Sequence, residues 1–104
     1  MGDGATLAIS PAEARETFVL RGEVDLDTAA QVADIPVIST GRRATLTLDV
    51  ADVTFIDSIG IWALVNLSRR LDGGKLVIAN ASPTVRRTLD LVDLSDVAGI
   101  VVNR

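Results

Sequence analysis

Apolar and polar residues along the chain follow two periodicities, one typical of strands and one typical of helices. Residues 44–50 alternate between threonine and larger apolar side chains, which predicts a β-strand. Residues 59–71 are largely apolar and contain no proline, which predicts a helix of about three to four turns. We expect residues 51–56, between these two elements, to form a short connection that ends on Phe55 and Ile56.

The remainder of the chain contains further segments with the patterns of strands and helices. Further elements are predicted as strands at 6–9, 16–21, 76–79 and 97–102, and as a helix from Ser82 and Pro83 to about residue 92. The first two strands are close enough in sequence to pair as a hairpin. From residue 16 onward strands and helices alternate, which predicts crossover connections. We therefore expect one α/β domain over residues 1–104, with a mixed, mainly parallel sheet of four to five strands and helices packed on it.

The first helix is expected to be short. It is predicted to begin in residues 25–28, where Asp25 and Asp27 are placed to cap it and to complement its dipole. Pro36 follows soon after, and a proline deep in a helix costs about 3 kcal/mol because it removes a hydrogen bond and clashes with the preceding turn. We expect this helix to stop or bend by Ile35.

The composition restricts the class of function. Hydrophobic residues make up 48% of the 104 residues, with only two phenylalanines and one tryptophan, so the core is predicted to be aliphatic. A net charge of −4 argues against nucleic-acid binding, which needs concentrated lysine and arginine. No apolar run approaches the ~20 residues of a membrane span, and the N-terminus has no secretory signal pattern. With no cysteine in the chain, we expect a cytoplasmic protein that does not insert into membranes.

Catalytic and metal chemistry are disfavoured by the residue types present. Without histidine, no Ser–His pair can activate Ser58, and the only lysine, Lys75, begins a different predicted strand. Zinc sites built on histidine or cysteine are excluded. Asp49, Asp52 and Asp57 do not follow the spacing of a calcium-binding loop. We therefore expect no catalytic residue, no metal site and no cofactor.

Asp57 and Ser58 open the longest predicted helix. An aspartate at this position accepts a hydrogen bond from the first unpaired backbone N–H groups. The same helix end favours negative charge, so it is suited to a phosphate on Ser58, which adds roughly −1.5 to −2 charges. An ordinary capping pair is the alternative interpretation. Because Asp25 and Ser58 both follow predicted strands, we expect them at the same edge of the sheet.

Residues 49–60 resemble the signature of the STAS domain, the family of anti-sigma-factor antagonists. The resemblance extends in order through residues 22–25, 73–80 and 82–89, and so covers roughly residues 6–102. It implies partner switching. The unphosphorylated form binds an anti-sigma factor, itself a serine kinase of the histidine-kinase-like ATPase type, and frees the sigma factor. Phosphorylation of Ser58 reverses the binding, and a serine phosphatase resets the cycle.

The resemblance also implies a set of partner-binding residues. They are Asp25, Asp57, Ser58, Ile59 and Gly60. Asp57 is expected to cap the helix and to orient the Ser58 hydroxyl, while Ile59 replaces the second serine or threonine usual in the family. Gly60 either lets a partner's backbone approach closely or packs against the sheet.

The sole tryptophan follows this motif by two residues. Trp62 is interpreted as a core residue in preference to an interface anchor, because it is the only large aromatic residue on an otherwise aliphatic helix.

Two departures from the family pattern keep other functions open. Residues 36–40 interrupt a helix that usually runs unbroken, and the chain has no room for the usual closing helix. Both are compatible with a constitutive scaffold subunit, in a stress-sensing complex or beside the ATPase of a lipid transporter. A nucleotide sensor is a third possibility, for which the sequence has no recognisable base or phosphate pocket.

Overall fold

The computed structural model describes residues 6–12, 16–36, 45–71 and 73–103. In chain order its elements are β1 (Leu7–Pro11), β2 (Thr17–Val24), α1 (Ala29–Ala33), β3 (Thr45–Ile56), α2 (Ser58–Arg69), β4 (Lys75–Ala79), α3 (Pro83–Leu91), the 3-10 helix η1 (Leu94–Asp96) and β5 (Ile100–Asn103). The strands form one sheet in the order β1-β2-β3-β4-β5. β1 and β2 pair antiparallel and the other neighbours pair parallel, so the predicted hairpin and mainly parallel sheet are confirmed.

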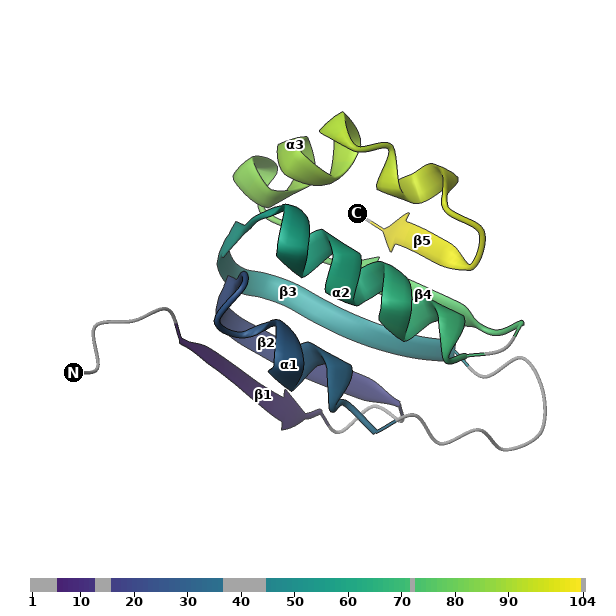
Figure 1. Cartoon of the computed structure of the whole chain (residues 1–104), viewed down its shortest axis with the longest axis horizontal. Helices are drawn as coiled ribbons and strands as arrows, with labels where there is room; N and C mark the ends of the chain where they lie inside the picture. Colours follow the sequence, from purple (N-terminus) through teal and green to yellow (C-terminus); the bar gives the residue numbers. More distant parts are fainter. Residues whose placement is uncertain (1–5, 13–15, 37–44, 72, 104) are drawn as a thin grey trace.

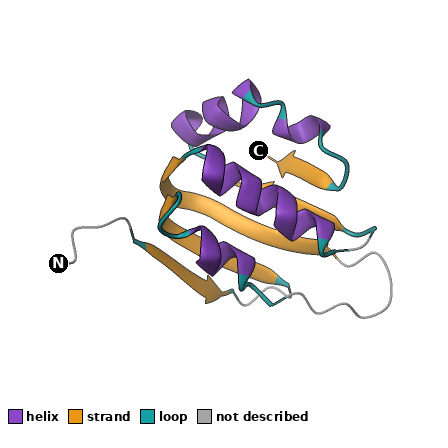
Figure 2. Cartoon of the chain, in the orientation of Figure 1, coloured by secondary structure: helices purple, strands orange, loops and turns teal. Residues whose placement is uncertain are grey.

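The helices pack on one face of this sheet (Figures 1 and 2). Along β3, Leu46, Leu48 and Val50 are buried, whereas the intervening Thr47 and Asp49 are only half-buried. Because successive side chains of a strand point to opposite faces, the buried set marks the face that carries the helices. The core joins this set to apolar residues of α2 and α3, including Leu64, Leu67, Val85 and Leu89.

α1 is short, as the position of Pro36 predicted. It ends at Ala33, and Ile35 follows as a buried core residue. The prediction that Asp25 and Asp27 cap this helix is wrong. Residues 25–28 form a turn, no acidic residue lies in the first helical turn, and the N-cap position is Thr28.

β3 is longer than predicted. Residues 51–56 were expected to form a connection, but the strand continues through them to Ile56. β2 runs in parallel as far as Val24, and Val24 pairs with Ile56 after two irregularities in register. The additional residues of β3 pair with β2, and Val24 and Ile56 are 32 positions apart in the sequence. The composition of residues 51–56 alone therefore did not indicate that the strand continues.

The remaining boundaries differ from the predictions by a few residues. β1 includes Pro11, which an edge strand tolerates because it needs no hydrogen-bond donor on its outer side. β5 begins at Ile100 instead of 97, because η1 ends at Asp96 and residues 97–99 form a bend and turn that lead into the strand. The predicted cap of α3 is confirmed, with the Val85 N–H donating to the Ser82 hydroxyl at 3.3 Å and Pro83 in the first helical position.

Candidate functional site

The candidate site lies where β2 and β3 end. Val24 and Ile56 are register partners, so the residues that follow them, Asp25 and Asp57, leave the sheet side by side. The Asp57 N–H donates to the Val24 carbonyl at 3.2 Å, which continues the ladder one step beyond β3. The start of α2 is thereby fixed to the end of β2. The structure thus brings the Asp25 and Ser58 segments to the same edge, as strand order predicted.

Asp57 caps α2. Its backbone is extended (φ −113°, ψ −175°), and its Oδ1 atom accepts from the Gly60 N–H at 2.8 Å. The Asp57 carbonyl accepts from the Ile61 N–H at 2.9 Å, which starts the helical hydrogen bonding. The capping role predicted for Asp57 is confirmed. An orienting contact with Ser58 is absent among the described residues, because the Asp57 carboxylate is directed along the helix start to Gly60.

Ser58 is exposed in the first position of α2. Within the described part of the chain, its hydroxyl forms no hydrogen bond. The N–H groups of Ser58 and Ile59 occupy helical positions that have no acceptor inside a helix. An anion on the Ser58 oxygen would therefore lie beside free donors at the positive end of the helix dipole. Chemically, the position can accept a phosphoryl group without displacing an existing contact.

Gly60 is buried against the end of β2. A Cβ atom at this position would lie 2.2 Å from the Val24 carbonyl oxygen and 2.8 Å from the Val24 carbonyl carbon. Real Cβ atoms do not approach backbone atoms so closely, so the position requires glycine if α2 is to keep its distance from β2. Of the two roles left open by the sequence, the structure shows packing against the sheet. Contact with a partner's backbone stays a prediction.

The connection from β2 to α1 is held by Thr28, which sequence reasoning missed as a site residue. The Thr28 hydroxyl donates to the Glu23 carbonyl at 2.7 Å and accepts from the Asp25 N–H at 2.9 Å. The Asp25 carboxylate accepts from the Asp27 N–H at 3.0 Å. Thr28 is only 1% exposed. An aspartate followed three positions later by a threonine is a recognisable signal for such a turn, because both side chains can bond the nearby backbone.

Trp62 is not a core residue, so that prediction is wrong. It is 54% exposed, and the Arg69 guanidinium carbon lies 5.6 Å from the centre of its ring. The buried side of α2 is formed by Ile61, Leu64 and Leu67, which recur at helical spacing. Position 62 falls on the opposite side of the helix, so the size and apolarity of tryptophan did not decide its placement.

Three further large apolar residues are exposed near this edge. We define the carboxyl-edge patch as Leu26, Phe55, Ile59 and Trp62. Leu26 is 71% exposed in the turn held by Thr28, and Phe55 and Ile59 are 48% and 41% exposed at the end of β3 and the start of α2. Several exposed apolar side chains at one place are a feature of interaction sites, whereas single ones are common on any surface. Of these residues, Ile59 and Trp62 adjoin Ser58 on α2, Trp62 one helical turn further along, so the serine lies beside exposed apolar surface suited to a protein partner.

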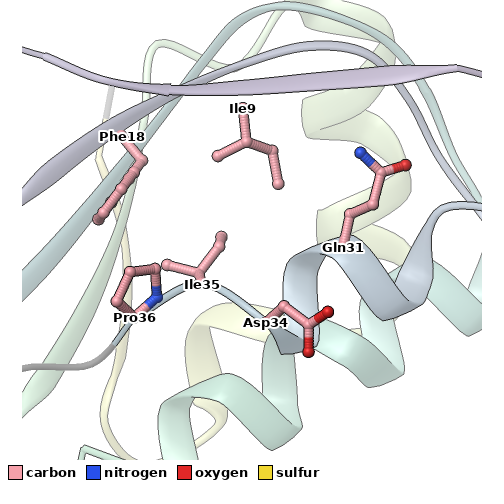
Figure 3. Close-up of a pocket in the computed structure, with 6 residues that line it drawn as sticks. All are labelled: Ile9, Phe18, Gln31, Asp34, Ile35 and Pro36. Carbon is pink, nitrogen blue, oxygen red and sulfur yellow. The ribbon is translucent and has the colours of Figure 1, made fainter.

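A separate hollow of about 310 Å³ lies between β1, β2 and α1 (Figure 3). Its lining is mostly apolar, from Ile9, Phe18, Ile35 and Pro36, with Asp34 and Gln31 on one side. The Gln31 amide already donates to a backbone carbonyl of β1 at 2.7 Å. Because Asp34 and Pro36 follow the last turn of α1, the hollow lies at the far end of that helix from Ser58 and does not belong to the site.

The residues that the structure describes contain neither a metal-binding cluster nor a membrane-spanning helix. Among these, no group of three or more histidine, cysteine, aspartate or glutamate side chains is arranged to hold a metal ion. None of the helices within the described ranges has both the length and the apolar character needed to cross a bilayer.

The fold and the site together define the class of the protein. It is an α/β domain with one mainly parallel sheet, with helices on one face of that sheet and with an exposed serine in the first position of the helix that follows the longest strand. A family model for the STAS domain matches residues 12–103, so the chain belongs to the STAS family. No curated protein matches the chain.

Solved structures agree with this fold. The anti-sigma factor antagonist SpoIIAA in its unphosphorylated form is similar with a TM-score of 0.58 and 21% identity, over 93% of this chain and 86% of that one. An anti-sigma factor antagonist from Mycobacterium paratuberculosis has a TM-score of 0.58 and 24% identity, over 97% and 88%. At these identities the similarity establishes the predicted STAS-like α/β fold.

Proposed function

We propose that this protein is an anti-sigma-factor antagonist that works by partner switching through Ser58. Its unphosphorylated form binds an anti-sigma factor that is also a serine kinase of the histidine-kinase-like ATPase type, and so frees a sigma factor. Phosphorylation of Ser58 ends the binding, and a serine phosphatase restores it. The protein is a binding module without catalytic activity of its own. Membership of the STAS family and the likeness to two anti-sigma factor antagonists support this role.

The exposed Ser58 hydroxyl, beside the exposed Ile59 and Trp62 of the same helix, is the observation that carries the proposal. A kinase can reach this hydroxyl, and a partner that covers Leu26, Ile59 and Trp62 would enclose it. Asp25 and Asp57 would lie at the rim of that interface. A phosphate brought into a tight, partly dehydrated interface beside two carboxylates costs free energy through repulsion and desolvation. A cost of ~3 kcal/mol lowers affinity by roughly a hundredfold, since each 1.4 kcal/mol is tenfold.

The first test is the modification itself. The protein is isolated from its own cells with and without phosphatase treatment, and its intact mass and peptides are measured. A phosphate on Ser58 in a fraction of the molecules supports the switch. An unmodified Ser58 across growth and stress conditions would instead favour a constitutive scaffold subunit, with Ser58 only the first residue of a capped helix.

The second test compares variants in binding to the purified ATPase-type partner. Ser58→Ala is expected to bind as tightly as the unmodified protein, and Ser58→Asp is expected to bind at least tenfold more weakly. Thr84→Asp is the matched control, because Thr84 is also exposed in the first turn of a helix but lies on α3. Equal binding by Ser58→Asp and Thr84→Asp would refute the proposed switch.

A further inference from the structure

The face of the sheet opposite the helices is uncovered by any described element. Its residues alternate with the buried core positions and are half-buried or exposed. Among them are Val19 of β2, Thr47 and Asp49 of β3, Lys75, Val77 and Ala79 of β4, and Val101 of β5. We call this set the open face. The register places Val77 beside Val101, and in a neighbouring row Asp49 lies between Ala79 and Val19.

Within this set, Lys75 and Asp49 carry opposite charges at the two ends, and the nearby Arg21 of β2 is already paired with Asp52 at 3.2 Å. Lys75 stands at the start of β4, beside Thr45 of β3. Asp49 stands further along β3, beside Ala79. Four residue steps separate these two rows, which is about 13 Å at ~3.3 Å per residue. Lys75 is the only lysine of the chain. One of the Asp49 carboxylate oxygens accepts from the Ala51 N–H at 3.1 Å, and the other forms no hydrogen bond with the described residues.

We propose that the open face binds the open face of a second copy of this chain. In a two-fold symmetric interface both copies use the same surface, so a contact from residue i of one copy to residue j of the other is repeated from j to i. The surface must therefore be complementary to itself. A two-fold axis that reverses the strand direction brings the Lys75 end of one copy over the Asp49 end of the other, and does so twice. Thr47, Val77 and Val101, which form the row between these ends, then pack in the middle. Two sheets stacked in this way lie about 10 Å apart, within reach of a lysine and an aspartate that extend toward each other.

The size of the face sets the expected strength. Four strands about 4.8 Å apart and about 13 Å of strand length cover roughly 200 Å² of the sheet plane. This is well below the ~800 Å² per partner of a stable interface. We therefore expect a weak dimer that forms at high protein concentration. The open face lies on the opposite side of the sheet from α2, so dimerisation leaves Ser58 and Trp62 free, and the proposal is independent of the switch.

Sedimentation velocity of the full chain over a wide concentration range tests the proposal. The unmodified protein is expected to show a concentration-dependent dimer. Lys75→Glu alone and Asp49→Lys alone should each shift dimerisation to at least tenfold higher concentration, because both place like charges opposite each other. An equimolar mixture of these two variants should dimerise again, since each interface then holds only opposite charges. Asp49→Asn removes the charge but retains an acceptor for the Ala51 N–H. It should also weaken dimerisation, which would show that the missing charge, and not a local change in the fold, causes the weaker dimer.

Arg87→Glu is the matched control, because it changes the charge of an exposed residue on α3, away from the open face. It should leave dimerisation unchanged. A protein that stays monomeric at all concentrations would overturn the proposal. So would a dimer that none of the open-face variants weakens, or mixed charge variants that fail to recover.

Zero-length carbodiimide cross-linking gives a second readout without substitutions. A peptide joining Lys75 to Asp49 cannot form within one chain, because the two residues are about 13 Å apart along the strands. In a mixture of isotope-labelled and unlabelled protein, this link should join one labelled and one unlabelled peptide. Links from Lys75 to other carboxylates, with none to Asp49, would contradict the proposed arrangement.

Discussion

Replacing Gly60 with alanine tests how closely α2 is held to the end of β2. The added Cβ atom would lie 2.2 Å from the Val24 carbonyl oxygen, which belongs to the backbone of a paired strand and cannot rotate away. Inserting a methyl group into a close-packed region typically costs 1–3 kcal/mol, and a clash with backbone is expected at about 3 kcal/mol. Alanine recovers about 1 kcal/mol through its higher helix propensity. The expected net loss of unfolding free energy is about 2 kcal/mol, or roughly 8–16 °C in the melting temperature of a domain this size.

Urea and thermal unfolding followed by circular dichroism measure this loss. Asn66→Ala is the control, because Asn66 is exposed on the same helix and should gain a few tenths of a kcal/mol from propensity alone. A Gly60→Ala variant as stable as the unmodified protein would show that α2 can move away from β2 without cost. The structural reason for glycine would then be wrong, and the partner-contact role of Gly60 would be the remaining explanation.

Three further substitutions separate structural from binding roles. Thr28→Val leaves the part-buried Glu23 carbonyl without its hydroxyl donor and should lower the unfolding free energy by about 1–3 kcal/mol, measured by urea unfolding; no change would contradict the role of the turn. Asp57→Ala removes the cap of α2 and should cost about 0.5–2 kcal/mol in the same assay, whereas Asp57→Asn should retain most of the stability. Trp62→Ala should cost under about 1 kcal/mol of stability, because the side chain is exposed and its contact with Arg69 is worth about 0.5–1 kcal/mol. Trp62→Ala should nevertheless weaken partner binding at least tenfold. In the unmodified protein, binding should shift the tryptophan emission to shorter wavelength. An unchanged emission spectrum together with an unchanged affinity of the variant would show that Trp62 is not in the interface.

The sequence was most informative where a local physical rule decides the structure. Pro36 predicted the early end of α1, and Ser82 with Pro83 predicted the start of α3, because both act on the adjacent helical turn. The alternation of strands and helices predicted the parallel sheet, and the order of elements then placed Asp25 and Ser58 at one edge.

The errors arose where distant pairing or helix orientation decides the structure. β3 extends to Ile56 because β2 continues beside it, a pairing across more than thirty residues that has no local signal. Trp62 was assigned to the core by residue type, although the spacing of Ile61, Leu64 and Leu67 already places it on the other side of the helix. Thr28 was overlooked because its role depends on bonding the Glu23 carbonyl and the Asp25 N–H across a turn.

The contacts at the start of α2 bear on how a phosphate at Ser58 would act. The helix start is fixed to β2 by the bond from the Asp57 N–H to the Val24 carbonyl and by Gly60 against the same residue. The Ser58 hydroxyl takes no part in these contacts, so a charge placed there need not move the helix. Negative charge at a helix N-terminus is worth about 0.3–1 kcal/mol, which offsets repulsion from Asp57. We therefore expect Ser58→Asp to change the unfolding free energy by less than about 1 kcal/mol, while it weakens partner binding at least tenfold. If Ser58→Asp instead unfolds several kcal/mol more easily, loss of binding would reflect damage to the fold, and the switch could not act through surface charge.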